Sequence, residues 1–276
     1  TGVYKSPVRG GKGRIPLICA DSGQDNAHKI FAFQVVEERT IALDKYVEQT
    51  YKINLGALDK LINLFLDNKI DKVIMLGKVN KSHLFDNFKP DLRMKQLLTR
   101  LDDLNDDSIL EAIVQQLEEC GLEVIPQFTY IEHLLPDSGV LTTGKPPEKI
   151  IKDMKYGLKM AREIGRLDIG QTVIVKDRAV LAVEAIEGTD AAIKRGGRLG
   201  QGNIVMAKVS KPQQDFRFDI PTIGLNTLKN LIRADASGLV FEADKTFLIE
   251  KEKFLDKAEK ANITVMAMEV KERFYE

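Results

Sequence analysis

The sequence predicts an α/β protein of two domains, an N-terminal Rossmann-like parallel sheet and a C-terminal mixed α/β domain. The chain has 276 residues, longer than most single hydrophobic cores, which favours two domains. Apolar strands alternate with helical patterns in both halves, which is typical of α/β folds. A stretch rich in proline and glycine divides the halves. We expect an N-terminal domain at residues 1–135, a linker at 136–147 and a C-terminal domain at 148–276.

The N-terminal half alternates strands and helices with short connections. In chain order we expect a strand at Lys29–Val36, a helix at Gly56–Asn68, a strand at Lys72–Leu76, helices at Lys95–Leu104 and Ser108–Cys120, and a strand at Leu122–Ile125. Asp106, Asp107 and Ser108 are candidates for the cap of the second helix of this pair. The first strand, within Val3–Arg9, is polar and contains Pro7, so we expect it to be distorted, at a sheet edge or displaced.

The C-terminal half has the same α/β pattern with some antiparallel content. Its expected elements are a helix at Glu148–Leu167, a hairpin of Gln171–Val175 and Ala179–Ala185, a helix at Thr189–Arg195, a strand at Asn203–Lys208, a helix at Thr227–Ala234, strands at Gly238–Glu242 and Thr246–Glu250, a helix at Lys251–Ala261 and a strand at Ile263–Met268.

Composition narrows the function classes. Lys and Arg number 41, as do Asp and Glu, so the net charge is zero and a nucleic-acid binder is disfavoured. The two cysteines, Cys19 and Cys120, have no zinc or disulfide spacing, which fits a reducing cytosol. Since no apolar run approaches the length of a membrane span and no leader pattern is present, we expect a cytoplasmic location.

Two segments concentrate carboxylates and cations. The first segment places Glu184, Glu187 and Asp190 at the end of an apolar strand and the start of a helix. These acidic residues either stabilise the start of the helix or bind Mg²⁺ or a sugar hydroxyl. The second alternates from Asp215 to Ile220, so that a strand would place Asp215, Arg217 and Asp219 on one face. Such a face is either a charged edge strand or the wall of a polar site, and neighbouring lysines favour the site.

Two glycine-containing turns are weaker phosphate candidates. The turn at residues 10–16 carries Lys12 and Arg14 before an expected helix, but it lacks the Walker A ending and is equally typical of a flexible terminus. Lys78 follows Gly77 at the carboxyl end of a predicted strand, where ligands of parallel sheets gather, although a surface turn that ends in Lys is commonplace and is the favoured interpretation.

At these segments the chain resembles the LpxI family of UDP-2,3-diacylglucosamine diphosphatases. The resemblance rests on long motifs at residues 167–171, 180–190, 211–215 and 219–224, with support from 11–16, 77–79 and 134–136. It implies an N-terminal Rossmann-like domain, a distinct C-terminal α/β domain and a lipid bound between them. It also implies Mg²⁺- or Mn²⁺-dependent hydrolysis of the pyrophosphate of UDP-2,3-diacylglucosamine to UMP and 2,3-diacylglucosamine 1-phosphate (lipid X), with water directed at the sugar-side phosphate, in lipid A biosynthesis.

Residue roles follow from the motifs and this resemblance together. Our hypothesis makes Asp219 and Asp215 catalytic, and gives the metal to Asp219, Asp215, Glu187 and Asp190. The substrate-binding candidates are Thr189, Gln214, Lys208, Lys211, Arg217, Lys78 and Gly188. The expected partners are a lipid-linked nucleotide sugar and the cytoplasmic face of the inner membrane, which the protein contacts peripherally. A homodimer is compatible with the sequence, and no nucleic acid is expected.

Two other classes stay open. The alternative is a non-catalytic two-lobed module that binds a nucleotide sugar or another anion, although it would gain nothing from four carboxylates beside a phosphate. A nucleotide-dependent oxidoreductase is disfavoured because the dinucleotide fingerprint is absent.

Overall fold

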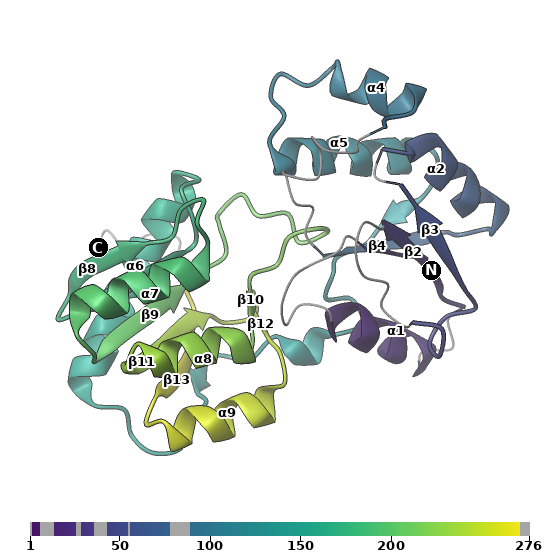
Figure 1. The fold of residues 1–276 in the computed structure, drawn as a ribbon. Coiled ribbons are helices and arrows are strands. Elements are labelled where there is room, and N and C mark those ends of the chain that lie inside the picture. The colour runs from purple at the N-terminus through teal and green to yellow at the C-terminus, as the bar shows by residue number, and fades with distance from the viewer. Residues whose placement is uncertain are drawn as a thin grey trace. The chain divides into compact units, whose positions relative to one another are not determined.

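The computed structural model describes residues 2–5, 14–25, 29–35, 43–54, 56–77 and 89–270, and the chain divides into two compact units. The N-terminal unit comprises residues 1–131 and 216–219, and the C-terminal unit comprises residues 132–215 and 220–276. Figure 1 shows both units as layers of helices and strands. The chain therefore passes from one unit to the other after residues 131, 215 and 219.

The N-terminal unit is built on a parallel sheet. Its strands are β1 (Gly2–Lys5), β2 (Phe31–Val35), β3 (Gln49–Ile53), β4 (Lys72–Leu76) and β5 (Glu123–Val124). Among the described residues their order is β3-β2-β1-β4-β5, and all neighbours are parallel. The expectation of an edge or displaced first strand is wrong, because β1 pairs on both sides, with β2 and β4. The strand ends at Lys5, and Pro7 lies outside the described residues.

Helices pack on this sheet through faces that the sequence spacing already indicates. They are α1 (Ile15–Asp25), α2 (Leu58–Asp67), α4 (Leu92–Leu98) and α5 (Asp106–Glu119). On α2 the buried side chains are Leu58, Leu61, Ile62 and Phe65, one face of a helix. Asn105 caps α5 by accepting a bond from the Ser108 amide at 2.8 Å, so the expected cap among residues 106–108 lies one residue too late.

The C-terminal unit confirms the predicted mixed sheet. Its elements are a 3₁₀ turn (Glu132–Leu134), β6 (Gly139–Val140), α6 (Glu148–Arg166), β7 (Thr172–Lys176), β8 (Ala179–Val183), α7 (Thr189–Gly200), β9 (Ile204–Lys208), β10 (Thr222–Ile223), α8 (Leu225–Arg233), β11 (Ala236–Glu242), β12 (Phe247–Leu248), α9 (Lys251–Lys260) and β13 (Thr264–Met268). In the described part of the chain, six strands are ordered β6-β13-β11-β9-β7-β8, and β10 pairs with β12 separately.

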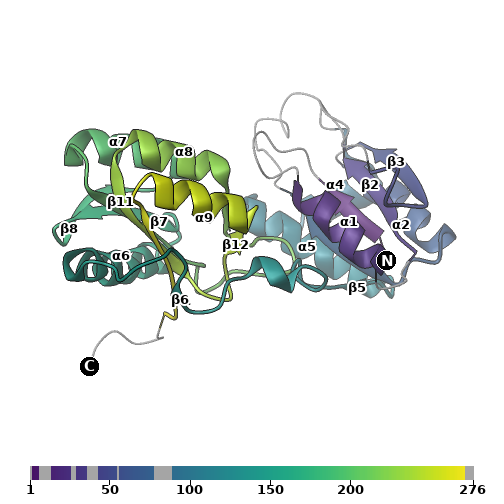
Figure 2. The ribbon, with the colours of Figure 1, turned by 90° about the horizontal axis from the view of Figure 1, so that it is seen from below.

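Helices cover both faces of the six-stranded sheet. Figure 2 shows α7, α8 and α9 on one face and α6 on the other. Two apolar clusters match these layers, one joining Ile193, Leu231 and Phe254 to the sheet and the other joining Met154 and Leu158 to it. Residues 136–147, the expected linker, include β6, which pairs antiparallel with β13. No helix in the ranges described is both long and apolar enough to cross a bilayer.

The predicted hairpin of β7 and β8 turns at two non-glycine residues in the left-handed region, Asp177 (φ 51°) and Arg178 (φ 58°). The buried carboxylate of Asp153, on α6, accepts the backbone N–H groups of both, at 2.9 and 2.8 Å. A strained turn is tolerated when its surroundings fix it, and Asp153 does so here. The hairpin in turn sets the position of the carboxyl end of β8, where the candidate site begins.

Candidate functional site

The candidate site lies along one edge of the C-terminal sheet. Lys208, the last residue of β9, pairs with Thr172 at the start of β7 and with Phe241 of β11. Because β7 runs antiparallel to β9, its first residue lies at the edge where β9 and β11 end. Glu184, just after β8, reaches the same edge, and its amide donates to the Thr172 carbonyl at 2.8 Å. Carboxyl ends of parallel strands are the usual binding edge of open α/β sheets.

Lys208 is a buried cation with hydroxyl partners. Its side chain is 4% exposed, and Nζ donates to Thr189 Oγ1 at 3.1 Å and to Thr172 Oγ1 at 3.4 Å. Thr189, the first residue of α7, donates its own hydroxyl to Glu184 Oε1 at 2.7 Å. A buried ammonium group is costly unless oxygen atoms surround it, so these contacts fix the position of the Lys208 ammonium group.

Gly170 brings the strands of this edge together. A Cβ atom at Gly170 would overlap the carbonyl oxygen of Glu184, so no other residue fits without a backbone shift. This glycine therefore has a packing requirement that its place in a motif did not reveal.

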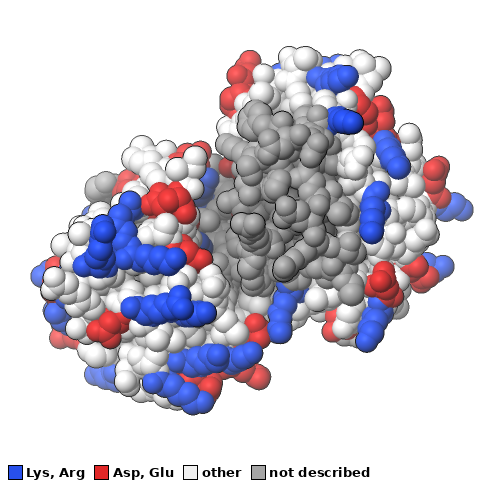
Figure 3. Space-filling model, viewed as in Figure 1, with Lys and Arg blue, Asp and Glu red and all other residues white. Residues whose placement is uncertain are grey.

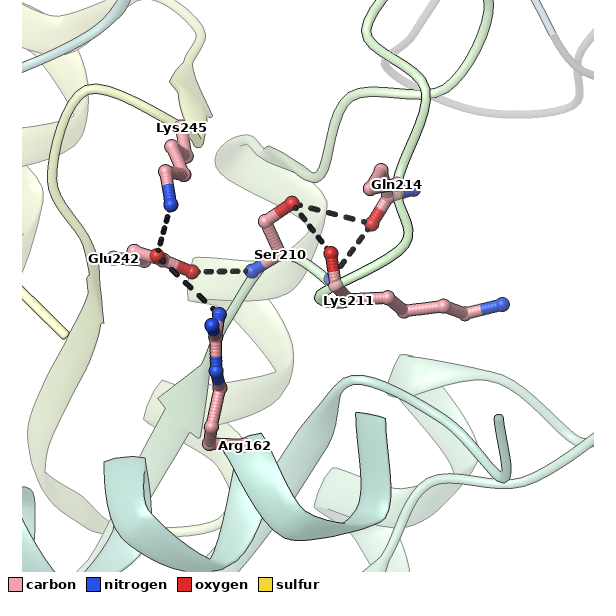
Figure 4. Close-up of polar contacts among 6 residues, drawn as sticks. All are labelled: Arg162, Ser210, Lys211, Gln214, Glu242 and Lys245. Atoms are coloured by element: carbon pink, nitrogen blue, oxygen red, sulfur yellow. Dashed lines mark hydrogen bonds and ion pairs between the residues drawn. The ribbon is translucent and has the colours of Figure 1, made fainter. Parts of the chain in front are cut away.

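A second cluster centres on the carboxylate of Glu242, the last residue of β11 (Figure 4). Glu242 is 1% exposed; one oxygen accepts the Ser210 amide at 2.8 Å, and the other meets Lys245 Nζ at 2.9 Å and Arg162 at 3.8 Å. A buried carboxylate needs such partners. Glu242 thereby ties α6 and the end of β11 to the first residue of the turn that follows β9.

That turn, residues 210–214, is held by its own polar groups. The Lys211 amide donates to Gln214 Oε1 at 2.9 Å, and the Gln214 amide donates to the Lys211 carbonyl at 3.0 Å. The Lys211 ammonium group meets Asp168 Oδ1 at 2.6 Å. The structure thus brings the predicted residues Lys208, Lys211, Gln214, Thr189 and Gly188 to one unit of the protein, with Lys208 and Thr189 in direct contact.

Two of the predicted metal ligands have other partners. Glu187 forms an ion pair with Arg195 at 2.7 Å, and Asp190 accepts a bond from the Asn226 amide at 2.7 Å. Within the described ranges, no three His, Cys, Asp or Glu side chains lie close enough together to hold a metal ion. Among the described residues of the C-terminal unit, Glu187, Asp190 and Asp215 therefore do not gather into such a group.

The predicted strand with Asp215, Arg217 and Asp219 on one face is wrong. Residues 216–218 form a turn, not a strand. The backbone carbonyls of Phe216 and Phe218 accept bonds from Gln127, through its amide at 2.9 Å and its side chain at 2.9 Å. The buried ring of Phe218 joins the core of the N-terminal unit. The alternation of polar and apolar residues gave a wrong strand prediction because the apolar ring of Phe218 fills a core instead of lying on one face of a sheet.

The two catalytic candidates are assigned to different units. Asp215 belongs to the C-terminal unit, and Asp219 to the N-terminal unit with Arg217, which pairs with Glu118 at 2.8 Å. Arg14 is exposed just before α1, whereas Lys12 and Lys78 lie outside the described residues.

Sequence reasoning missed several residues of the edge. They are Arg162, Thr172, Ser210, Glu242 and Lys245, with Glu184 noted but given no role. A usable signal was present, since Glu184 and Glu242 each end an apolar strand, as Lys208 does. Polar residues at the carboxyl ends of buried strands therefore indicate a candidate site, as dense charge motifs do.

Fold and site together define an α/β protein whose C-terminal sheet carries a buried cation and hydroxyl groups at one edge. Two family models match the chain, the LpxI N-terminal domain over residues 9–134 and the LpxI C-terminal domain over residues 137–266. UDP-2,3-diacylglucosamine pyrophosphatase LpxI of Caulobacter vibrioides is 32% identical over 256 residues, covering 88% of this chain and 90% of the relative. The chain belongs to the LpxI family, as its motifs predicted.

Proposed function

We propose that this protein hydrolyses the pyrophosphate bond of UDP-2,3-diacylglucosamine, releasing UMP and 2,3-diacylglucosamine 1-phosphate for lipid A biosynthesis. The observation that carries this proposal is the match to both LpxI domains together with a relative named for that activity. The buried Lys208 supports it, because a pyrophosphate is an anion whose hydrolysis needs fixed positive charge.

The edge of the C-terminal sheet would hold the pyrophosphate. Lys208 donates to a phosphate oxygen, and Thr189 holds its ammonium group in place through their contact at 3.1 Å. The start of α7 adds backbone N–H groups, which favour an anion at a helix N-terminus. Lys211 and Gln214 offer further donors from the turn that Glu242 fixes.

Asp219 and Asp215 remain our proposal for the carboxylates that orient the attacking water. Water adds to the sugar-side phosphorus, the bond from that phosphorus to the bridging oxygen breaks, and UMP leaves with that oxygen while a proton of the water passes to a carboxylate. Arg217 would have to leave Glu118 to reach a phosphate, because the two already pair at 2.8 Å.

A divalent cation remains a separate proposal. Mg²⁺ or Mn²⁺ prefers carboxylate oxygens and would offset pyrophosphate charge, which supports a requirement for it. Since the carboxylates described here form no group of three, no step is routed through the metal. Activity measured after EDTA treatment, with and without added Mg²⁺, tests the requirement directly.

The N-terminal unit is proposed to bind the uridine nucleotide. Its strand order is that of Rossmann-like, doubly wound sheets, in which ligands bind outside the carboxyl ends where the strand order reverses. Here that point lies between β1 and β4. The two acyl chains of the substrate would bring the protein to the surface of a membrane.

The test is to incubate the full chain with UDP-2,3-diacylglucosamine and Mg²⁺ and to measure UMP by chromatography. Release of UMP and the sugar phosphate in equal amounts is expected. A binding module would bind the nucleotide lipid in the same assay and leave it intact. That result would overturn the proposal.

A further inference from the structure

A hollow of about 320 Å³ lies between α7 and α8, away from the candidate active site. It is lined by Lys194, Gly197, Arg198, Gly202, Asn230, Arg233, Ala234 and Asp235. These residues come from the middle and C-terminal parts of both helices and the segments just after them, whereas Thr189 begins α7 at its other end. Figure 3 shows Lys and Arg gathered over this face of the C-terminal unit.

Three cations surround the hollow without neutralising partners. Among the described residues, Lys194, Arg198 and Arg233 make no salt bridge and no side-chain hydrogen bond. Asp235 is the one carboxylate in the lining, so the lining keeps a net charge of +2 (three cations less one carboxylate). Surface cations are usually spread out or paired, and their convergence on one hollow creates a positive potential.

Asn230 adds a neutral polar group to the lining. The residue is only 6% exposed, and its side chain makes no hydrogen bond within the described part of the chain. Its amide atoms are not among the buried unpaired ones, so they reach the solvent that fills the hollow. A ligand in the hollow would give its NH₂ group an acceptor.

Helix dipoles explain only part of this arrangement. Arg198 and Arg233 lie in the last turns of α7 and α8, where positive charge stabilises a helix. The helix dipole does not explain the other two residues, because Lys194 lies in the middle of α7 and Asn230 carries no charge.

Two glycines shape the hollow. A Cβ atom at Gly197 would come within 2.6 Å of Ala234 Cβ, so glycine lets α7 approach the end of α8. A Cβ atom at Gly202 would overlap the carboxylate of Asp235, so that carboxylate rests against the glycine backbone at the wall.

We propose that this hollow is a second anion site, which binds a single phosphate group. Arg198 and Arg233 can each offer two N–H donors to phosphate oxygens, Lys194 a point charge and Asn230 an amide donor. The phosphate can come from a free ion or from the headgroup of an anionic phospholipid. The site is independent of the proposed hydrolysis, since none of its residues belongs to the edge around Lys208.

The first experiment measures binding of inorganic phosphate to the full chain by titration calorimetry, in a buffer without phosphate or sulfate. Every protein in this comparison, including the reference, carries Lys208→Met, so that phosphate binding at the candidate active site does not contribute. Adding Arg198→Gln and Arg233→Gln together should weaken the affinity by about tenfold or more. Lys257→Gln is the matched control, because Lys257 is an exposed cation in the last turn of α9 and lies outside the hollow.

A second arm measures sedimentation with vesicles of phosphatidylglycerol or phosphatidylcholine. Loss of phosphatidylglycerol binding in the double variant but not in Lys257→Gln identifies a lipid headgroup as the source; the same pattern with inorganic phosphate alone identifies a free ion. The proposal is overturned if neither ligand binds, or if Lys257→Gln weakens binding as much as the double variant. Hydrolysis by the Arg198→Gln, Arg233→Gln protein with Lys208 intact should stay at the wild-type rate, so the two proposals fail separately.

Discussion

At the scale of single residues, the burial of Lys208 should cost stability. Burying its ammonium group against two hydroxyls satisfies hydrogen bonds but leaves the charge uncompensated by a direct carboxylate bond in the described residues. Sites that bind charged ligands often retain such costs, because activity needs the destabilising group.

Replacing Lys208 with Met keeps the volume of the side chain and removes its charge. Stability to urea should stay within about 1 kcal/mol of wild type or rise, because a buried charge is replaced by an apolar group. The rate of UMP release should fall about 100-fold or more, because the donor to the phosphate is gone. Lys257→Met, an exposed position on α9, is the control for loss of one positive charge. Wild-type turnover by a folded Lys208→Met protein would contradict the role of Lys208.

The two cysteines should differ in reactivity. Cys19 on α1 is 1% exposed, and burial raises its pKa from 9.0 to about 12, so almost none of it is thiolate near neutral pH. Cys120 is partly exposed. A thiol reagent at about pH 8 should therefore modify Cys120 first and Cys19 only with unfolding.

The raised pKa of Cys19 also predicts that the protein loses stability as the pH rises above the value for a free thiol. The folded state holds the Cys19 proton more tightly than the unfolded state, so its contribution is complete below pH 9.0 and is lost as the pH rises towards about 12. In urea melts between those values, wild type should lose more stability than Cys19→Ala. Parallel losses in the two proteins, or modification of Cys19 as fast as Cys120, would contradict burial of this thiol.

Residue chemistry was predictable from sequence where the residue type itself was unusual. Charge in one segment singled out Lys208 and Lys211, and a helix-start signal in another singled out Thr189; the structure brings Lys208 and Thr189 into contact. Glu242 was not, because its partner Arg162 is 80 positions away (242 − 162) and only the sheet brings them together. Contacts of this kind depend on packing that a local pattern does not contain.

At the scale of elements, α7 shows how a local rule misplaces a boundary. The sequence predicts its end at Arg195, because two glycines follow, yet the helix continues to Gly200. The glycines are there for packing: a Cβ atom at Gly196 would lie 2.5 Å from Ile174 Cγ2 of β7.

Gly196→Ala should therefore destabilise the protein, although alanine is the better helix former by about 1 kcal/mol. The added methyl group would force α7 away from the sheet, at a net cost of roughly 1–3 kcal/mol in the free energy of unfolding. Urea denaturation measures this. Ala191→Gly, at a partly exposed position earlier in α7, is the control for propensity alone. A Gly196→Ala protein more stable than wild type would show that the helix is not packed as described.

Strand predictions succeeded where apolar residues run continuously and failed where they alternate. The buried strands β4, β7, β9 and β11 all lie where apolar runs place them. Residues 215–220 alternate as a strand would, but their backbone bonds to Gln127, which is 88 or more positions away in sequence (215 − 127). Pairing partners decide whether an alternating segment becomes a strand.

At the scale of the whole molecule, the chain does not divide its two units at one point. Residues 216–219 return to the N-terminal unit from within the C-terminal half of the sequence. Their return contributes Phe218 to a core that also contains Val73, Met75 and Val124. The N-terminal core therefore includes a residue from beyond position 200.

Phe218→Ala should therefore destabilise the N-terminal unit and leave the C-terminal unit unchanged. Phe218 is 6% exposed, and removing a buried ring of this kind costs roughly 3–5 kcal/mol in stability, less where the site collapses. Hydrogen exchange followed by mass spectrometry separates the two units: amides of β4 and α5 should exchange faster, while those of β9 and β11 keep their protection. Phe254→Ala, in the core of the C-terminal unit, is the reciprocal control and should show the opposite pattern. Equal loss of protection in both units from Phe218→Ala would mean that they unfold as one cooperative body, and no change in either would remove Phe218 from the N-terminal core.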